Sequence, residues 1–295
     1  MSDNDALDYC AEQGMMTELN GSAGLVGGLP NDPPALARVV QGLGIYDVVA
    51  RDFYGYAIPA DRLGELHLRR IAARLERLME LDGRPLDAKR PAERRVIGRC
   101  NQFALMMVAM LRQKGVPARS RGGFAAYFNA PKFEDHWVCE YWSAKEQRWS
   151  LVDAQLDEVW RERLAIRFDV TDMPRAQFLT AAEAWRRCRS GEADPELFGI
   201  SFAGLRGLWF IAASLVRDIA ALNKMEMLPW DVWGAQPPPD DKLDATRLKV
   251  FDDLARLACD PDANFDELRD RYENDEGLRV PATVFNALAE RMEAL

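Results

Sequence analysis

Apolar residues recur at helical spacing in the first third of the chain. In residues 62–81 they form one stripe, made by Leu63, Leu66, Ile71, Leu75 and Leu78. This period predicts an amphipathic helix, and Asp61 is expected to cap its first turn. Residues 35–81 as a whole are therefore expected to be helical. Residues 1–35 contain several glycines and prolines, which predict an irregular lead-in.

The next apolar segment has no polar face. Residues 103–111 are apolar on every side of a helix that would begin at Cys100, so this helix is expected to be buried all round. Gly115 stands where a C′ glycine ends a helix, and Pro117 follows it. The pattern predicts a central buried helix from Cys100 to the residues before Gly115.

The period then changes from that of a helix to that of strands. Residues 118–128, 136–142 and 148–153 read as three strands, and residues 143–147 as the turn between the last two. Residues 155–295 are expected to be mostly helical, with a break at the prolines of 237–239. Residues 207–216 are strongly apolar, but ten residues are too few to span a bilayer, so we expect a buried helix.

These elements predict an α+β fold in which a buried helix packs on an antiparallel sheet. The expected division is a helical N-terminal lead-in and support at 1–90, an α+β core at 91–160 and a mostly helical C-terminal part at 161–295. No internal repeat is present.

The composition argues against a nucleic-acid-binding protein and against a disulfide-stabilised protein. The 295 residues are 48% hydrophobic and 29% charged, with a net charge of −9 and a pI near 5.0. An acidic chain lacks the dense cationic surface that nucleic acids require, so no nucleic-acid partner is expected. No signal peptide and no membrane segment are evident. The five cysteines are widely spread without a Cys-x-x-Cys pair, which argues against a disulfide frame and predicts a cytoplasmic protein.

A run of basic residues precedes Cys100. It comprises Lys89, Arg90, Arg94, Arg95 and Arg99. We interpret the run as a solvated helix face and approach loop. The alternative is a positive field that steers an anionic substrate or favours a thiolate.

Cys100 is the candidate nucleophile. At a helix N-terminus, unpaired backbone N–H groups and the helix dipole favour the thiolate form of a cysteine. The same N–H groups can stabilise an oxyanion after attack on a carbonyl. Gly98, two residues earlier, is expected to let a substrate approach closely.

A base and an orienting acceptor for Cys100 are also present. His67 and His136 are the only histidines; His67 lies in the predicted 62–81 helix, whereas His136 opens a strand. A hairpin turn centred on residues 144 and 145 would set Asp153 opposite His136, within hydrogen-bond reach. Asp135 is the weaker candidate, because adjacent strand residues point to opposite faces.

These three segments resemble the transglutaminase-like superfamily. The nucleophile segment is Gly-Arg-Cys100 followed by an apolar helix that ends in Gly-Val-Pro-Ala-Arg119. The histidine strand is Asp135-His136-Trp137-Val138, and the aspartate strand is Trp149-Ser-Leu-Val-Asp153. The order Cys, His, Asp matches over about residues 92–160. Longer segments around residues 122–142 and 228–234 also resemble bacterial members of similar size.

The resemblance implies a papain-like core and a cysteine mechanism. Cys100 would attack an amide to form a thioester, His136 would act as general base and acid, and Asp153 would orient His136. Hydrolysis of an amide or peptide is the leading expectation, as in a peptidase or amidase. Amide formation on a small molecule or peptide is one alternative, and a non-catalytic binding module is the other. No cofactor is implied, because a thiol triad performs acyl transfer alone.

The remaining candidates have simpler interpretations. Cys139 lies on the strand face opposite His136 and is expected in the core, and Cys10, Cys188 and Cys259 are expected to be structural. No cluster has metal-ligand spacing. Trp137, beside His136, and Trp230 and Trp233, in an aromatic turn, are candidate pocket walls, although packing is the commoner role of such a turn.

Overall fold

The computed structural model describes residues 3–295 and has an α+β fold with a mixed sheet packed against helices. The chain forms two compact units. The first unit contains the residues up to Ser120 together with Val138–Pro174, and the second contains Arg121–Trp137 and Arg175–Leu295. Strands β3 (Ala118–Asn129) and β4 (Lys132–Ser143) therefore each contain residues of both units. The expected borders near residues 90 and 160 stay a prediction.

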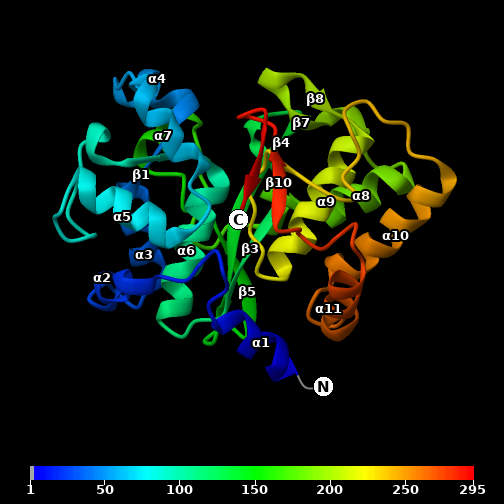
Figure 1. Ribbon diagram of the computed structural model, residues 1–295, viewed down its shortest axis with the longest axis horizontal. Helices are drawn as coiled ribbons and strands as arrows, with labels where there is room; N and C mark the ends of the chain where they lie inside the picture. The colour runs from blue at the N-terminus through cyan, green and yellow to red at the C-terminus, as the bar shows by residue number, and fades with distance from the viewer. Residues whose placement is uncertain (1–2) are drawn as a thin grey trace. The chain divides into compact units, whose positions relative to one another are not determined.

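The first unit is built around helix α6 (Cys100–Gln113), which begins at the expected cysteine. Every residue from Cys100 to Arg112 is buried. Gly115 follows the helix with a φ of +71°, a conformation that a glycine adopts without strain. The prediction of a helix buried on all faces is confirmed. The helices around it are α1 (Asp3–Ala11), α2 (Ala23–Gly27), α3 (Pro33–Leu43) and α5 (Ile71–Leu81) (Figure 1).

The region before α6 differs from the expectation. Residues 62–81 are not one helix, because the 3-10 helix η3 (Ala60–His67) ends before α5 begins. Leu68 and Arg70 between them are extended, and the Ile71 N–H bonds the carbonyl of Met16 at 2.9 Å. This tertiary bond holds the chain out of helix at the break. Asp61 lies inside η3, whose cap is Pro59, so the predicted cap is wrong.

Shorter elements fill the rest of the N-terminal region. Residues 1–35 hold α1 and α2 rather than an irregular lead-in, and residues 35–81 include a strand. The elements are η1 (Asn20–Ser22), β1 (Gly44–Tyr46), η2 (Asp47–Val49), α4 (Ala50–Tyr54), η4 (Ala92–Arg94) and β2 (Val96–Gly98). Helix α7 (Glu158–Arg163) is a further short helix of the first unit, later in the chain. Their formation depends on contacts between distant residues, which the local pattern does not contain.

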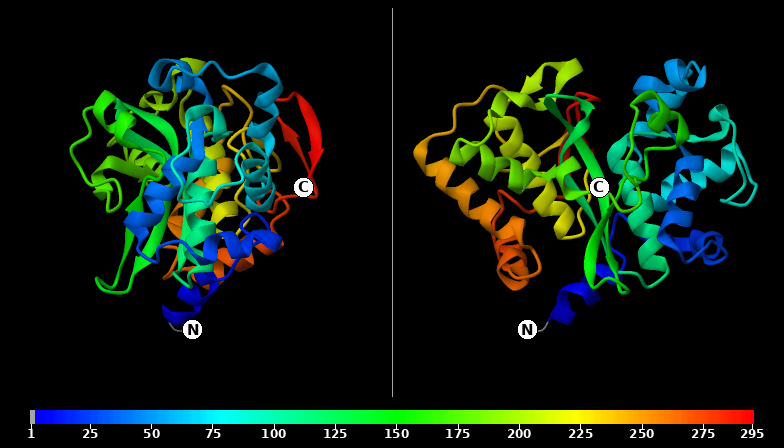
Figure 2. Two further views of the ribbon diagram at one scale, coloured as in Figure 1. Left: turned by 90° about the vertical axis from the view of Figure 1, so that its left-hand side faces the viewer. Right: turned by 180° about the vertical axis from the view of Figure 1, so that it is seen from behind.

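The main sheet confirms the three predicted strands. Its order is β6-β3-β4-β7-β8, and β5 also pairs with β4. The pairs β3–β6, β4–β5 and β7–β8 are antiparallel, whereas β4 and β7 are parallel, so the sheet is mixed. Figure 2 shows β3 and β4 as its longest strands. The other strands are β5 (Arg148–Val152), β6 (Phe178–Thr180), β7 (Phe198–Ile200) and β8 (Leu205–Arg206).

The hairpin between β4 and β5 has a different register from the one expected. Cys139 pairs with Val152, and Ser143 pairs with Arg148. The turn is therefore centred on residues 145 and 146, and continuing the ladder would place Asp153 opposite Val138, not His136. The predicted register is wrong by two residues because a four-residue turn closes the hairpin. A shift of two keeps side chains on the same strand face, since side chains alternate with period 2.

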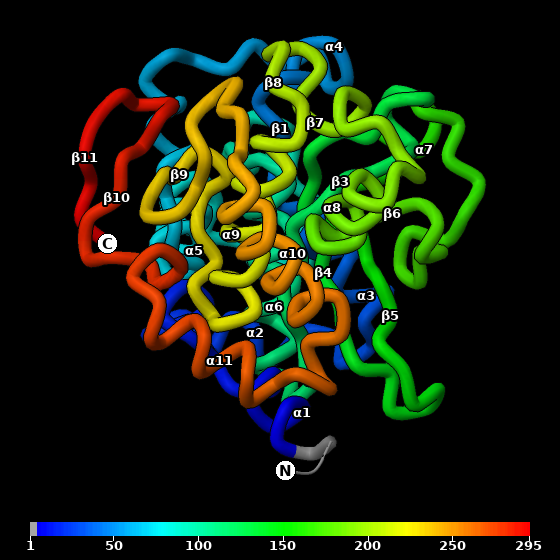
Figure 3. Tube along the Cα trace, turned by 90° about the vertical axis from the view of Figure 1, so that its right-hand side faces the viewer, coloured from blue at the N-terminus to red at the C-terminus, as the bar shows by residue number. Residues whose placement is uncertain are grey.

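The second unit carries the helical layer expected in the C-terminal half (Figure 3). Helix α9 contains the predicted apolar segment, and every residue from Trp209 to Leu222 is buried. A three-stranded sheet of order β11-β10-β9 was not expected. The helices are α8 (Ala181–Ser190), α9 (Leu208–Leu222), α10 (Ala245–Cys259) and α11 (Phe265–Asn274). The strands are β9 (Asp231–Val232), β10 (Thr283–Asn286) and β11 (Arg291–Ala294), and three 3-10 turns are η5 (Arg175–Gln177), η6 (Pro195–Leu197) and η7 (Ser201–Ala203).

A buried ion pair ties α9 to β3 inside the second unit. Asp218 is fully buried and accepts hydrogen bonds from Arg121 Nε at 3.1 Å and Nη2 at 3.0 Å. Its Oδ1 also accepts the Gly122 N–H at 2.8 Å. A buried charge needs this degree of pairing to be tolerated. The pair therefore fixes the helix against the strand.

We expect Asp218→Ala to destabilise the protein by about 3–5 kcal/mol, because it leaves the Arg121 guanidinium buried without a counter-charge. Chemical unfolding measures the loss. The control is Glu196→Ala, which removes the exposed partner of Arg206 (3.1 Å) and should cost at most about 1 kcal/mol. Equal losses in the two variants would contradict the assigned role of Asp218.

Candidate active site

Cys100 is the first residue of α6 and is 5% exposed. Arg99 before it has extended backbone, with φ −122° and ψ 178°, so the helix starts sharply at the cysteine. The first N–H groups of any helix have no partner within the helix. Cys100 thus occupies the position that the sequence indicated for a nucleophile.

Strand β2 leads into this helix start and is held on one edge by β1. The two strands pair in parallel, with Ile45 opposite Ile97 and Tyr46 opposite Gly98. The Arg99 guanidinium then bonds Asp47 through two contacts, Nε to Oδ1 at 2.9 Å and Nη2 to Oδ2 at 2.8 Å. A bidentate pair of this kind fixes orientation as well as distance. The segment entering Cys100 therefore has little freedom on this side.

Gln102 braces the first turn of the helix from inside. Its Oε1 accepts the Arg99 N–H at 2.8 Å, and its Nε2 donates to the Leu66 carbonyl at 2.8 Å. The side chain is 1% exposed. One amide thus satisfies a helix-terminal N–H and connects α6 to η3.

Gly98 has a different role from the one expected. A Cβ at this position would lie 2.5 Å from Arg74 Nη2 and 2.9 Å from Gln102 Oε1. The space beside Gly98 is therefore filled by protein, and the expectation that it admits a substrate is wrong. Arg74 is 1% exposed, and burial lowers its pKa to about 10, partly offset by the Glu65 charge.

Asp153 lies directly after β5 and is fully buried. Its N–H donates to the Val170 carbonyl at 2.8 Å, and its Oδ1 accepts the Gln155 N–H at 3.0 Å. The following residues are also held, since Gln41 Nε2 donates to the Leu156 carbonyl at 3.1 Å. The Asp153 backbone N–H and its Oδ1 are thus both bonded by residues of the first unit.

His136 lies on β4 in the second unit and is 2% exposed. Its ring packs edge-on against Phe128, with centroids 4.9 Å apart and planes at 72°. Tyr127 makes a second edge contact at 6.0 Å. These aromatic contacts restrict the rotation of the imidazole. The nucleophile and aspartate candidates therefore belong to one unit and the histidine candidate to the other.

Asp135 has electrostatic neighbours both on α9 and on its own strand, where His136 and Glu134 adjoin it. Burial raises the pKa of its carboxyl group, while the Arg217 charge and a hydrogen bond with Ser214 act in the opposite direction. Arg217 is 5% exposed and donates to Ser214 Oγ and Gln236 Oε1, each at 3.0 Å. Asp135 therefore belongs to a polar cluster with α9.

Part of the basic run before Cys100 is buried rather than solvated. Arg90 is 1% exposed, and its guanidinium donates to backbone carbonyls that include Arg84 at 2.6 Å and Ala88 at 3.0 Å. Arg95 donates to the Arg90 carbonyl at 3.1 Å. The prediction that these side chains are solvated is wrong for Arg90 and Arg95. The Arg90 guanidinium bonds carbonyl groups of the loop before it, and Arg95 bonds the Arg90 carbonyl. Lys89 and Arg94 are exposed as expected.

Comparison with known protein families finds a match, over part of the chain. The sequence model of the Transglutaminase-like superfamily matches residues 68–154, a range that includes Cys100, His136 and Asp153. Residues 68–154 form a transglutaminase-like domain. No curated protein matches the chain.

Two solved structures show remote similarity. One is described as a "putative cysteine protease" from Cytophaga hutchinsonii, with 15% identity and a TM-score of 0.32, covering 50% of this chain and 42% of that one. The other is red sea bream transglutaminase, with 13% identity and a TM-score of 0.30, covering 50% and 30%. The chain therefore spans less than half the length of either structure.

Cys10, Cys139 and most of the tryptophans are buried, whereas Cys188, Cys259, Trp142 and Trp230 are partly exposed. Cys139, in the transglutaminase-like domain, is fully buried, which confirms its place in the core, and burial raises the pKa of its thiol. Trp137 is 3% exposed and covers Gly122, where a Cβ would lie 2.9 Å from its ring. Trp233 Nε1 donates to the Leu278 carbonyl at 3.0 Å. A pocket-wall role for Trp137, Trp230 and Trp233 stays a prediction.

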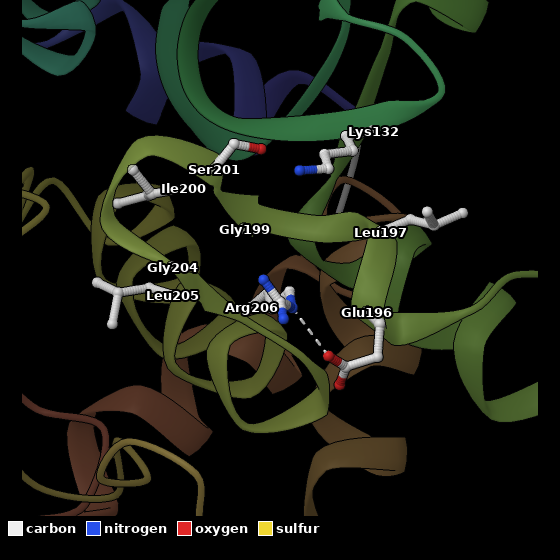
Figure 4. Close-up of a pocket in the computed structure, with 9 residues that line it drawn as sticks. All are labelled: Lys132, Glu196, Leu197, Gly199, Ile200, Ser201, Gly204, Leu205 and Arg206. Carbon is white, nitrogen blue, oxygen red and sulfur yellow. Dashed lines mark hydrogen bonds and ion pairs between the residues drawn. The ribbon is translucent and has the colours of Figure 1, made fainter.

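A small pocket lies in the second unit, and one of its lining residues, Lys132, is on β4 four residues before His136. Its lining includes Lys132, Glu196, Ser201 and Arg206 (Figure 4). A volume of about 10 Å³ holds roughly one water molecule, and the Arg206–Glu196 pair occupies its rim. Among residues 3–295, no three His, Cys, Asp or Glu side chains group as a metal site. No helix in this range has the length and apolar character to cross a bilayer.

Sequence reasoning missed the supporting residues of Cys100. Asp47, Glu65, Arg74 and Gln102 were not singled out, yet all contact the segment from Ile97 to Arg99. Arg74 did carry a signal, because it lies three residues after Ile71 and four before Leu78, on the apolar stripe. A charged residue at a stripe position indicates a buried polar network.

We expect Gly98→Ala to destabilise the protein by about 1–3 kcal/mol, because the new methyl group collides with the Arg74 guanidinium. Thermal or urea unfolding measures the change. Gly64→Ala is the matched control, since nothing lies within 4 Å of its added Cβ. A Gly98→Ala protein as stable as the Gly64→Ala protein would contradict the close packing described for Gly98.

The raised pKa of Asp135 predicts a pH-dependent stability difference. A carboxyl group whose folded pKa exceeds its ordinary value of 3.8 favours folding when protonated. Its contribution is therefore lost as the pH rises through the folded pKa. Asp135→Asn should gain stability relative to wild type between pH 3.5 and pH 7 in urea unfolding. A difference that is constant with pH, or that falls, would contradict this environment.

Proposed function

We propose that the protein is a cysteine enzyme that hydrolyses an amide bond through a thioester, as a peptidase or amidase does. Cys100 is the nucleophile, His136 the general base and acid, and Asp153 the residue that orients His136. The observation that carries the proposal is a cysteine at the first position of a buried helix, within a domain of a superfamily whose members are usually cysteine enzymes.

Acylation follows from the chemistry of these three groups. Cys100 Sγ forms a bond to the amide carbonyl carbon as His136 takes the thiol proton. The carbonyl oxygen becomes an oxyanion, and the Cys100 backbone N–H is the donor that we propose for it. The C–N bond then breaks, and the amine leaves with the proton from His136. A thioester on Cys100 remains.

Deacylation reuses the same base. His136 takes a proton from water, the water oxygen attacks the thioester carbonyl, and the C–S bond breaks. The acid leaves, and His136 returns the proton to the Cys100 sulfur. Asp153 stabilises the imidazolium that forms in each half of the reaction. The substrate class is accordingly an amide or a peptide, and no cofactor takes part in the proposed steps.

The compartment is part of the same proposal. All five cysteines are free thiols in the structure. A thiol nucleophile among unpaired cysteines suits a reducing environment. We therefore place the enzyme in the cytoplasm.

The first test is alkylation at about pH 6 with iodoacetamide, read by intact mass and peptide mapping. One label is expected, on Cys100, because nucleophilic cysteines react as thiolates. Burial raises the pKa of Cys188 to about 12 and also raises that of Cys259, so both should stay unlabelled. Cys139→Ala should label like wild type, and Cys100→Ala should not label. An inert Cys100 in folded protein would contradict the proposal.

The second test exposes wild type and Cys100→Ala to a panel of peptides, amides and thioesters. A mass increase on wild type alone would identify the trapped acyl group and hence the substrate class. His136→Asn should lower the acylation rate by about 10²-fold or more, the usual contribution of a general base. Turnover that survives Cys100→Ala would remove Cys100 from the mechanism.

A further inference from the structure

We infer that Glu65 is a positioning residue for the Cys100 nucleophile. The buried Glu65 carboxylate and the Arg74 guanidinium clamp Ile97, and through it the backbone that presents the Cys100 N–H to an oxyanion. This inference depends on the proposed function. Glu65 lies outside residues 68–154, the range that matches the superfamily.

The clamp acts on both polar groups of one peptide residue. The Ile97 N–H donates to Glu65 Oε2 at 2.8 Å, and the Ile97 carbonyl accepts from Arg74 Nη2 at 3.2 Å. In a strand, the N–H and C=O of one residue point to the same side. Both groups therefore point away from β1. Strand β2 is held between β1 on one edge and this pair of side chains on the other.

Glu65 is itself rigidly held. It is 5% exposed, and its carboxylate accepts Arg62 Nε and Nη2, each at 2.8 Å, and Arg77 Nε at 2.9 Å. Burial alone would raise the pKa of Glu65, but hydrogen bonds from Arg62, Ile97 and Arg77 outweigh it, and the pKa lies below its ordinary value. The carboxylate is therefore ionised at neutral pH. Each of its two oxygens accepts two hydrogen bonds, and one of the four comes from the Ile97 N–H of the strand.

Arg62 extends the clamp to the chain just before β2. Its Nη1 donates to the Glu93 carbonyl and its Nη2 to the Arg95 carbonyl, each at 2.8 Å. Residues 93–97 are thus tied to η3 at three points. The Arg99–Asp47 pair and Gln102 continue the support to Cys100. Side-chain contacts at Glu93, Arg95, Ile97 and Arg99 thus hold this segment before the helix begins.

The geometry predicts a loss specific to carbonyl chemistry. A small displacement of β2 moves the Cys100 N–H relative to the oxyanion, and displacements of about 1 Å can cost about 10²-fold in rate. Alkylation by iodoacetamide forms no oxyanion. A positioning defect should therefore slow acylation much more than alkylation, whereas a loss of folded protein lowers both equally.

Glu65→Asp is the test variant, because it keeps the charge beside Arg62 but withdraws the carboxylate from Ile97. The probe is p-nitrophenyl acetate: Sγ bonds to the acetyl carbon, the ester C–O bond breaks, p-nitrophenolate leaves, and His136 takes the thiol proton. We expect the burst rate to fall about tenfold or more and iodoacetamide alkylation to change less than about twofold. Glu140→Gln is the control, since Glu140 is an equally buried carboxylate that pairs with Arg119 at 2.8 Å. It should leave the ratio of the two rates unchanged.

Each outcome decides the inference. Equal loss of both rates in Glu65→Asp, or no loss, would overturn it. If circular dichroism shows that Glu65→Asp does not fold, Arg74→Lys decides, because it keeps the buried charge and loses the bond to the Ile97 carbonyl. If wild type shows a burst that Cys100→Ala lacks, but neither Glu65→Asp nor Arg74→Lys loses acylation selectively, the inference about Glu65 is overturned and the proposed function stands. No burst in wild type, together with an inert Cys100, would overturn the proposed function.

Discussion

The hydrogen bonds of Ile97 are the constraint on which the cysteine segment depends. A helix that starts with a nucleophile needs a fixed entry, because the direction of its first N–H groups is set by the residues before it. Here the entry is a three-residue strand, too short to be stable alone. Parallel pairing with β1 holds one edge, and Glu65 and Arg74 hold the other.

This support has an energetic cost that apolar packing would not have. Arg62, Arg74 and Glu65 are all less than 9% exposed, and the Arg74 Nε has no hydrogen-bond partner among residues 3–295. Replacing buried ion pairs by apolar residues is often neutral or stabilising in other proteins. Charged groups can, however, bond the backbone of a strand edge, which apolar side chains cannot. Fixing a strand that has only one neighbour is a physical reason to retain them.

The spacing of apolar residues along the chain correctly predicted the helix and strands whose formation depends on nearby residues. The all-apolar run after Cys100 gave a buried α6, Gly115 ended it, and alternation gave β3, β4 and β5 with their turn. The break at Leu68 was missed because a backbone bond from Ile71 to Met16 imposes it. The hairpin register was missed because the number of turn residues, four, is not encoded in the alternation.

The candidate site residues could likewise be predicted only where the local sequence carries the signal. Residue type and order indicated Cys100, His136 and Asp153, which all lie within the transglutaminase-like domain. The groups that hold the backbone at or near Cys100 and Asp153 were not predictable, because Glu65, Gln41 and Val170 come from distant parts of the chain. Arg90 shows the reverse error: a basic run reads as surface, yet this guanidinium is buried among carbonyls.

Imidazole nitrogen NMR tests the central claim most directly, namely that Cys100, His136 and Asp153 act together. The chain has only two histidines, so His136→Gln assigns both ring systems, and His67 serves as an internal control. If the three residues form a triad, Cys100→Ala and Asp153→Asn should each shift the ¹⁵N signals of His136 and leave those of His67 unchanged. His136 signals that are indifferent to both substitutions would contradict the account.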